Sequence, residues 1–364
     1  MRVSIVRCDS YENNEVRKAL ESSLKNLDFK FKKNLKVLIK PNILSPHPPE
    51  KAITTHPTIL GELCKILQKH NAKIYIGESS SYDTKQAFRI SKIGELKKYA
   101  EIINFETHEK EFANFKTIKK VLLPRILSEV DLIINVPKLK THTFTGLTLC
   151  VKNLYGCIPG KIKSSYHKIL RSPGNFSKFL LELHERIKPS LNIIDGVIGL
   201  EGMGPATAGK PVKSKVIISG DNAIATDIIA SEILGFNPYS IYSNKLAGVE
   251  KSKIEIVGEP IKIAFEKPPS SLSFTTPFFH FLNNIFPKPK IFFDHSKCTK
   301  CRLCENNCPV KAIELAPFPE CKHKKCIRCA CCVEVCPNSA VTLKEDLTKR
   351  TARKLYKKLL KNQS

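Results

Sequence analysis

The sequence predicts a two-part protein, in which a large α/β domain with a largely parallel sheet precedes a small, cysteine-rich α+β domain. Three observations support this prediction. Over the first 268 residues, short β-rich runs alternate with helical stretches. Several of these runs are almost continuously apolar, as strands covered on both faces should be. Finally, ten of the fourteen cysteines fall between residues 298 and 336.

Six segments of the first domain have the composition of strands. They are expected at residues 3–7, 36–40, 73–77, 131–136, 191–194 and 215–219. One helix should begin near Thr55, which can cap it, with Pro57 in its first turn. Another should run from about residue 175 to 188, and a third should follow the capping pair Asp221 and Asn222.

Two stretches break this alternation. Residues 41–57 and 137–167 are long, rich in Pro, Gly, Thr, Lys and His, and each directly follows an expected strand. In open α/β sheets, ligands bind in the crevice at the carboxyl ends of the strands. We therefore expect these two loops to carry the binding site of the domain.

The chain carries 60 Lys and Arg against 34 Asp and Glu, a formal net charge of +26 at pH 7. Such a surplus attracts anions, including nucleic acid, phosphorylated ligands and acidic protein partners. A solvated, generally lysine-rich surface has the same composition. The sequence contains no RNA- or DNA-binding motif and no basic patch interleaved with aromatic residues, so nucleic acid is not the expected partner.

Composition also bears on the compartment. No apolar run approaches the roughly 18 residues needed to cross a bilayer, and polar residues follow Met1 too soon for a signal peptide. We therefore expect a cytoplasmic protein. That compartment keeps thiols reduced, so cysteines clustered this closely indicate metal binding rather than disulfides.

The cysteine cluster consists of one motif in two copies. The second copy follows the first after 28 residues, and the copies are Cys298-x2-Cys301-x2-Cys304-x3-Cys308-Pro309 and Cys326-x2-Cys329-x2-Cys332-x3-Cys336-Pro337. An Ala followed by a β-branched residue comes at the same offset in both, at 312–313 and at 340–341. The whole unit is therefore duplicated, and not only its thiols.

This unit of about 55 residues resembles the bacterial-type two-cluster ferredoxins. The resemblance implies two [4Fe–4S] clusters, each bound by three cysteines of one copy and the last cysteine of the other. By position, cluster 1 takes Cys298, Cys301, Cys304 and Cys336, and cluster 2 takes Cys308, Cys326, Cys329 and Cys332. Zinc is the alternative for paired Cys-x2-Cys units, but a zinc site has no use for the third and fourth cysteine of each copy.

Two cysteines of this region have no counterpart in the first copy. Cys331 aligns with Leu303 and is expected to be a buried small hydrophobe, and Cys321 is expected to be a bystander. Positive charge around the clusters should raise their potentials and favour an acidic redox partner. The basic residues concerned are Lys297, Lys300, Arg302, Lys324, Lys325 and Arg328.

A second resemblance covers most of residues 1–268. It rests on an ordered series of short motifs: Lys40-Pro41-Asn42, Thr54-Thr55-His56-Pro57, Gly77-Glu78-Ser79, Pro137-Lys138-Leu139-Lys140-Thr141-His142, Lys152-Asn153-Leu154-Tyr155-Gly156, Tyr166-His167, Asp195-Gly196 and Gly220-Asp221. The series is similar to the family catalogued as domain of unknown function 362, which often precedes a two-cluster ferredoxin in one chain. The resemblance implies this architecture and no particular reaction.

The residues themselves suggest an anion site. Lys138, Lys140, Lys152 and Lys161 lie close together in a Gly- and Thr-rich stretch, and lysines beside backbone amides at such a turn bind carboxylate or phosphate. Neither a Walker motif nor a dinucleotide fingerprint is present. The alternative is an ordinary cluster of loop lysines. The expected ligand-binding residues are Lys40, Asn42, His56, Lys138, Lys140, His142, Lys152, Asn153 and His167.

A weaker hypothesis concerns four acidic residues at expected strand ends. Together with His142 and His167 they would bind a divalent metal or act as acid–base groups. Capping and turn formation are the competing roles of the individual residues. The four are Glu78, Asp195, Glu201 and Asp221.

The sequence thus predicts an iron–sulfur electron-transfer protein, a component of an oxidoreductase in an anaerobic-type cytoplasm. Its two clusters would exchange electrons with the anion site of the α/β domain or with a partner oxidoreductase. The alternative is a ligand- or partner-binding protein whose clusters are structural or sensory. The expected parts are an α/β domain at 1–268, a linker at 269–290, the two-cluster domain at 291–345 and a basic helical tail at 346–364.

Overall fold

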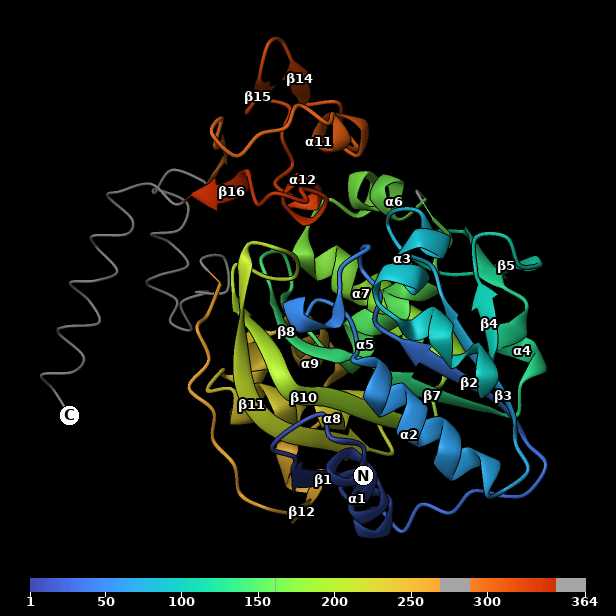
Figure 1. Ribbon diagram of the computed structural model, residues 1–364. Helices are drawn as coiled ribbons and strands as arrows, with labels where there is room; N and C mark the ends of the chain where they lie inside the picture. Colours follow the sequence, from blue (N-terminus) through green and yellow to red (C-terminus); the bar gives the residue numbers. More distant parts are fainter. Residues whose placement is uncertain (161, 269–288, 345–364) are drawn as a thin grey trace, which may run out of the picture.

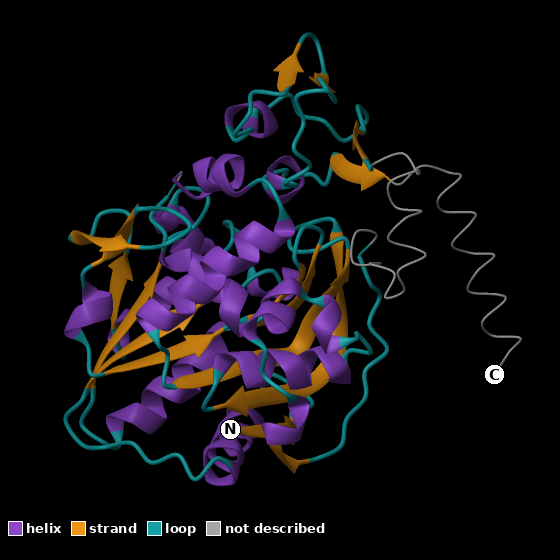
Figure 2. Cartoon of the chain, turned by 180° about the vertical axis from the view of Figure 1, so that it is seen from behind, coloured by secondary structure: helices purple, strands orange, loops and turns teal. Residues whose placement is uncertain are grey.

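The computed structural model describes residues 1–160, 162–268 and 289–344, and it confirms the predicted fold class. A ten-stranded mixed sheet, parallel over most of its width, forms the centre of the first domain. Helices cover both faces of this sheet, and the small cysteine-rich module lies at one end of the domain (Figures 1 and 2). Most of the predicted linker and the whole predicted tail lie outside the described residues, and the domain boundaries stay predictions.

All six predicted strands are present in the sheet, and four further strands join them. The ten are β1 (Arg2–Arg7), β2 (Lys36–Pro41), β3 (Lys73–Glu78), β4 (Glu101–Asn104), β7 (Leu132–Val136), β8 (Lys138–His142), β9 (Gly146–Thr148), β10 (Leu191–Gly202), β11 (Gly209–Gly220) and β12 (Glu255–Gly258). Their order is β12-β1-β11-β10-β7-β2-β3-β4, with β8 attached to β10 and β9 to β8. The pairs from β10 through β7, β2 and β3 to β4 are parallel, whereas β11 runs antiparallel to both β1 and β10.

The helices divide between the two faces. α1 (Asn13–Asn26), α2 (Pro57–Gln68) and α3 (Thr84–Ile90) cover one face, and α7 (Pro173–Ile187) and α8 (Ala223–Ile233) cover the other. Successive residues of a strand point to opposite faces. In β2, Val37 and Ile39 accordingly join the core under α1 and α2, and Leu38 joins the core under α7 and α8. The remaining elements of the domain are α4 (Ile126–Glu129), α5 (Cys150–Asn153), α6 (Ile162–Leu170), α9 (Tyr242–Ala247) and the separate hairpin β5 (Lys110–Asn114) and β6 (Lys120–Pro124).

The helix starts are close to those predicted, with one correction. Asn222 caps α8, as expected. The cap of α2 is His56, whose Nδ1 accepts from the Thr58 amide, and not Thr55. The Thr55 hydroxyl instead donates to the Val136 carbonyl (2.6 Å) and accepts from the Asn42 amide (2.8 Å). It thereby links the ends of β2 and β7, which is a tertiary contact that local sequence cannot reveal.

The second predicted loop is also corrected. Residues 137–167 fold into β8, β9, α5 and most of α6. The polar residues of β8 are almost fully buried and bonded to neighbouring segments. Because this strand is stabilised by polar contacts, its sequence lacks the apolar run by which strands are usually recognised.

The cysteine-rich module is a small α+β unit with two short antiparallel strand pairs. β13 (Lys290–Phe293) pairs with β16 (Val341–Lys344), and β14 (Ile313–Leu315) pairs with β15 (Pro319–Cys321). Two one-turn helices, α11 (Leu303–Asn306) and α12 (Cys331–Glu334), complete it. α12 faces the α/β domain (Figure 1). None of the helices that the structure describes is long and apolar enough to cross a membrane.

Candidate functional site

The duplicated motif folds into duplicated local structure. Residues 28 positions apart share a left-handed backbone, with φ of 57° and 56° at Lys300 and Arg328 and of 59° and 64° at Arg302 and Ala330. The fourth cysteine of each copy also makes the same bond, because the amide four residues later donates to its Sγ at 3.1 Å in both copies. The two copies therefore present their thiols in the same way.

The structure brings the cysteines of the module close together, and their division between two clusters stays a prediction. Those predicted for cluster 1 line a single cavity: Cys298, Cys301, Cys304 and Cys336. Burial raises the pKa of the Cys332 thiol well above its usual value, and its neighbours Cys329, Cys326, Cys308 and Cys304 add to this effect. Within the described part of the chain, no three His, Cys, Asp or Glu side chains are grouped to hold a single metal ion. Four thiols around a wider space suit a cluster, in which each thiolate binds a different iron.

The module docks over the carboxyl ends of the parallel strands. The Tyr82 hydroxyl donates to the Val335 carbonyl, and the Thr207 hydroxyl donates to the Cys336 carbonyl at 2.9 Å. Met203 packs against the apolar core of the module. These contacts place α12 directly above the crevice where ligands bind in open α/β sheets.

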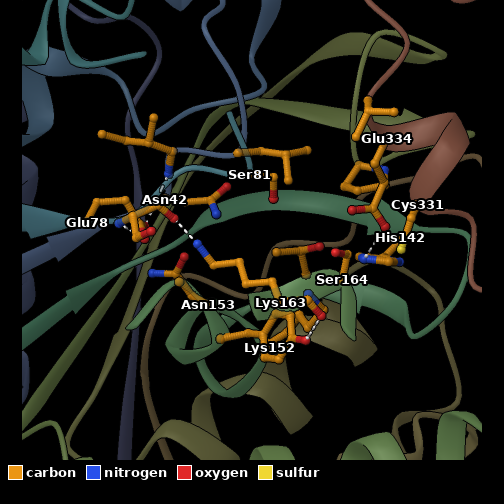
Figure 3. Close-up of a pocket in the computed structure, with 18 of the residues that line it drawn as sticks. Asn42, Glu78, Ser81, His142, Lys152, Asn153, Lys163, Ser164, Cys331 and Glu334 are labelled. Atoms are coloured by element: carbon orange, nitrogen blue, oxygen red, sulfur yellow. Dashed lines mark hydrogen bonds and ion pairs between the residues drawn. The ribbon is translucent and has the colours of Figure 1, made fainter. Parts of the chain in front are cut away.

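A pocket lies at this junction and is lined from both sides. Its volume is about 70 Å³, and a buried water needs roughly 10–15 Å³ on the same measure, so the pocket has room for several waters or one small ligand. Figure 3 shows one end formed by Asn42, Glu78 and Asn153, the other by His142, Cys331 and Glu334, and Lys163 between them. Because Cys331 and Glu334 belong to α12, the pocket exists only when the module is docked.

The structure brings six of the nine predicted ligand-binding residues together around this pocket. They are Asn42, Lys140, His142, Lys152, Asn153 and His167. A seventh, Lys40, lies next to it and forms a fully buried ion pair with Glu78 (Nζ to Oε2, 2.6 Å). Gly156 covers this pair closely, since a Cβ there would lie 2.6 Å from Lys40 Nζ. Lys161 lies outside the described residues.

The other two residues, His56 and Lys138, belong to a separate buried network around Asp195. Lys138 Nζ donates to Asp195 Oδ2 at 2.9 Å and to the Tyr11 hydroxyl at 2.6 Å. The His56 amide donates to the same carboxylate, and the His56 ring stacks on Tyr11. Lys138 and Asp195 neutralise each other in this network, and neither His56 nor Lys138 lines the pocket.

The lysines make the pocket electropositive. Lys140 Nζ donates to the Ile53 carbonyl (2.8 Å), and burial lowers its pKa to about 7. Lys163 Nζ donates to the Ser79 carbonyl, and burial lowers its pKa to about 8. Lys152 extends over the rings of Tyr155 and Phe176 at 4.8 and 5.4 Å. An amine with a pKa near neutrality can hold or release a proton at physiological pH.

The two histidines are neutral. Burial lowers the pKa of His167 to about 3 and that of His142 well below its usual value. His142 Nδ1 accepts from the amides of Phe144 (3.1 Å) and Thr145 (3.4 Å). Its proton is therefore on Nε2, which lies 3.3 Å from Oε1 of Glu334.

The short helix α5, which carries Lys152 and Asn153, is held by a carboxylate from another helix. Asp227 of α8 accepts from the amides of Cys150 (2.7 Å) and Val151 (3.0 Å). Burial raises the pKa of Asp227 to about 7, and these two hydrogen bonds oppose that effect. Its carboxyl oxygens satisfy helix amides that would otherwise be unpaired. Asp227 is thus a positioning residue for this side of the pocket.

The acidic set proposed for metal binding does not assemble. Glu78 pairs with Lys40, Asp195 with Lys138, Glu201 accepts from the Glu266 amide and Asp221 from the Arg2 amide. None of these four contacts a histidine of the pocket among the described residues. That hypothesis was wrong, because each carboxylate is used by a nearer partner.

Among the pocket residues with charged or thiol side chains, three were not predicted as ligand-binding residues. Glu334 and Cys331 come from the module, and the interpretation of Cys331 as a buried small residue is incomplete: it is buried, but it also lines the pocket and lies against Cys329. Lys163 was missed because nothing distinguishes it among the many lysines of the chain. The four cysteines of the α/β domain are buried, and none of the fourteen cysteines, all of which lie in the described residues, forms a disulfide.

Comparisons with known proteins agree with the sequence motifs. Residues 37–232 match the model of the domain of unknown function DUF362, and residues 291–314 match that of a 4Fe–4S binding domain. A thylakoid-associated protein of Synechocystis is 28% identical over 257 residues, which are 66% of this chain and 76% of that protein.

Among solved structures, the lactate racemase apoprotein of Thermoanaerobacterium thermosaccharolyticum is 16% identical, with a TM-score of 0.41. The match covers 60% of this chain, which spans about half (53%) of the length of that structure. The DUF362 match by contrast extends over just over half of the present chain. The protein therefore belongs to the DUF362 family and carries a 4Fe–4S binding domain after its α/β domain.

Proposed function

We propose that this protein is an electron-transfer protein, whose two [4Fe–4S] clusters exchange electrons with a small anionic ligand held in the pocket between the α/β domain and the module. One observation carries the proposal. The pocket wall opposite the lysines is α12, and Cys331 on this wall precedes the proposed cluster ligand Cys332. The Cys331 thiol also lies against that of Cys329, another proposed ligand. A ligand in the pocket would touch the protein shell of a cluster.

The duplication supports two clusters rather than one. The 4Fe–4S match covers the first copy of the motif, and the second copy repeats its spacing, its left-handed residues and its bond to the fourth thiol. When bound, the clusters would supply or accept one electron at a time.

The residues of the chain would bind the ligand and handle its protons. Lys152, Lys140 and Lys163 would attract the negative group. With a pKa of about 7 in a buried site, the ammonium group of Lys140 would give a proton to a ligand that gains negative charge. Docking of α12 would keep bulk water out and so strengthen these charge interactions.

A partner protein would supply electrons to the clusters or accept electrons from them. The distal surface of the module exposes basic residues on both copies of the motif: Lys297, Lys300, Arg302, Lys324 and Lys325. Such a surface favours an acidic redox partner and a fast, salt-dependent encounter. We further propose a cytoplasmic, anaerobic-type setting, where free thiols and exposed clusters persist.

The test is to reduce the anaerobically prepared protein with dithionite and to follow reoxidation of the clusters as candidate anions are added. Anion-dependent reoxidation that is lost in Lys152→Met would support the proposal. Reoxidation only by a partner protein would favour a carrier, in which the pocket is not the electron acceptor. Clusters that cannot be reduced would refute electron transfer and leave the structural or sensory role. A preparation with zinc in place of iron would refute the clusters themselves.

A further inference from the structure

The pocket contains an unusual number of polar atoms without partners. Buried polar side chains in proteins are nearly always hydrogen-bonded. Among the described residues, however, five buried side-chain atoms that make no hydrogen bond belong to residues lining this pocket. They are Asn42 Oδ1, Thr148 Oγ1, Asn153 Oδ1, His167 Nδ1 and Glu334 Oε1. Of these, Glu334 Oε1 lies 3.3 Å from His142 Nε2 but accepts no hydrogen bond from it. Such a concentration marks the pocket as a place where bound water or a ligand completes the hydrogen bonds of these atoms.

The hydrogen bonds of Asn153 show which kind of group the ligand must supply. Its side chain is 2% exposed, and its Nδ2 donates to Asn135 Oδ1 at 2.8 Å and to the Pro41 carbonyl at 3.2 Å. Both of these partners are acceptors, so the orientation of the amide is determined and the unpaired atom is Oδ1. An unpaired Oδ1 can be satisfied only by a hydrogen-bond donor.

The lysines of the pocket require a second feature of the ligand, which is a negatively charged group. Lys40 is paired with Glu78, and Lys140 and Lys163 bond to carbonyls. Within the part of the chain that the structure describes, Lys152 makes neither a hydrogen bond nor an ion pair; its ammonium lies over aromatic rings. This ammonium is available to a negatively charged group.

We propose that the pocket binds a small anion that also donates a hydrogen bond through an O–H group, with its charge at Lys152 and its hydroxyl on Glu334, the acceptor at the α12 end of the pocket. This inference rests on the anion pocket of the proposed function and names the class of its ligand. A protonated oxyanion such as hydrogen phosphate and a hydroxylated carboxylate share this chemistry. A fully deprotonated oxyanion would leave this acceptor unpaired and bring negative oxygens against it.

The experiment uses two matched pairs of anions and isothermal titration calorimetry on the oxidised, cluster-loaded protein at pH 7. Phosphate carries at least one proton at this pH and sulfate carries none, although the two have the same shape. Glycolate differs from acetate by its hydroxyl group. We expect phosphate to bind about tenfold or more tightly than sulfate, because a buried unpaired acceptor is costly. We likewise expect glycolate to bind more tightly than acetate, and equal binding of these two anions would count against the proposal.

Glu334→Gln is the diagnostic variant, because it replaces an acceptor by an amide of the same shape that can donate to sulfate. We expect the preference for phosphate to fall by at least threefold in Glu334→Gln and to be unchanged in the exposed control Glu320→Gln. Equal binding of phosphate and sulfate, binding of neither pair, or an unchanged preference in Glu334→Gln would each overturn the proposal. No electron donor is present, so selective binding can be found even if electron transfer to the pocket fails.

Discussion

The cysteine-rich module and the interdomain pocket are built in opposite ways. In the module, all proposed ligands lie between Cys298 and Cys336, and their spacing and left-handed residues are repeated after 28 positions. In the pocket, residues from the segment after β2 and from β3, β8, β9, α5, α6 and α12 meet, although 292 positions separate Asn42 from Glu334. A local motif therefore defines the metal site, whereas the ligand site depends on the whole fold and on docking of the module.

The two regions also differ in how they accommodate charge. The basic residues of the module are exposed and solvated. Those of the pocket are held in particular surroundings: Lys40 by its ion pair with Glu78, Lys140 and Lys163 by backbone carbonyls, and Lys152 over aromatic rings. We therefore expect changes in the module to act on one cluster at a time, and changes around the pocket to affect both stability and binding.

The largest effect is expected inside the module. Cys332→Ala should reduce the iron content from about eight to about four atoms per chain, because it removes a ligand of one cluster. Cys331→Ala should keep about eight, although the two cysteines are adjacent. Iron and sulfide analysis, together with EPR spectroscopy of the reduced protein, measures the cluster content of the two variants. Equal loss in the two variants would contradict the ligand assignment.

Around the pocket, Glu78→Gln should be the most harmful single change. It leaves the ammonium of Lys40 buried without a counter-charge, and breaking a buried ion pair in this way costs about 3–5 kcal/mol. Urea denaturation measures the free energy of unfolding. The exposed pair of Arg125 and Glu109 (56% and 74% exposed) provides the control, since Glu109→Gln should cost under about 1 kcal/mol. Similar losses of unfolding free energy in Glu78→Gln and Glu109→Gln would show that the buried ion pair is no more important for stability than the exposed one.

Lys152→Met should weaken anion binding and leave the stability of the fold unchanged. It removes the unpaired ammonium, and a hydrogen bond to a charged group contributes about 1.5–3 kcal/mol, so phosphate should bind about 10- to 100-fold more weakly. The unfolding midpoint should hardly change, because Lys152 makes no hydrogen bond or ion pair to another described residue. Lys213→Met, at an exposed lysine, is the control. If both variants bind phosphate like the unchanged protein, the anion does not bind at Lys152.

The smallest effect concerns pH. The pKa values of Lys140 and Lys163 are lowered by burial to about 7 and about 8. Both amines are protonated below pH 7 and lose their charge as the pH rises through these values, so affinity for an anion should fall. We expect glycolate, whose charge is constant above pH 6, to bind several-fold more weakly at pH 9 than at pH 6.5. Lys140→Met should remove the part of this change near pH 7; an unchanged profile would mean that Lys140 does not contribute.

How far the site could be predicted is clearest in β8. Lys138, Lys140 and His142 were all chosen as ligand residues, and alternation along a strand gives them the same face. Only Lys140 and His142 reach the pocket, because Lys138 bonds to Asp195, a residue 57 positions away. The strand itself was taken for a loop, since its stability comes from these polar contacts and not from an apolar pattern.

The fold class, the strands with apolar runs, the family and the duplicated cysteine motif could all be predicted from the amino-acid sequence, because periodicity and spacing are local patterns. The folded chain was needed to find which lysines remain available, that Glu334 and Cys331 of the module complete the pocket, and which atoms there lack partners. Pairing and burial depend on segments that meet only when the chain is folded, and the pKa values and unpaired acceptors follow from that burial.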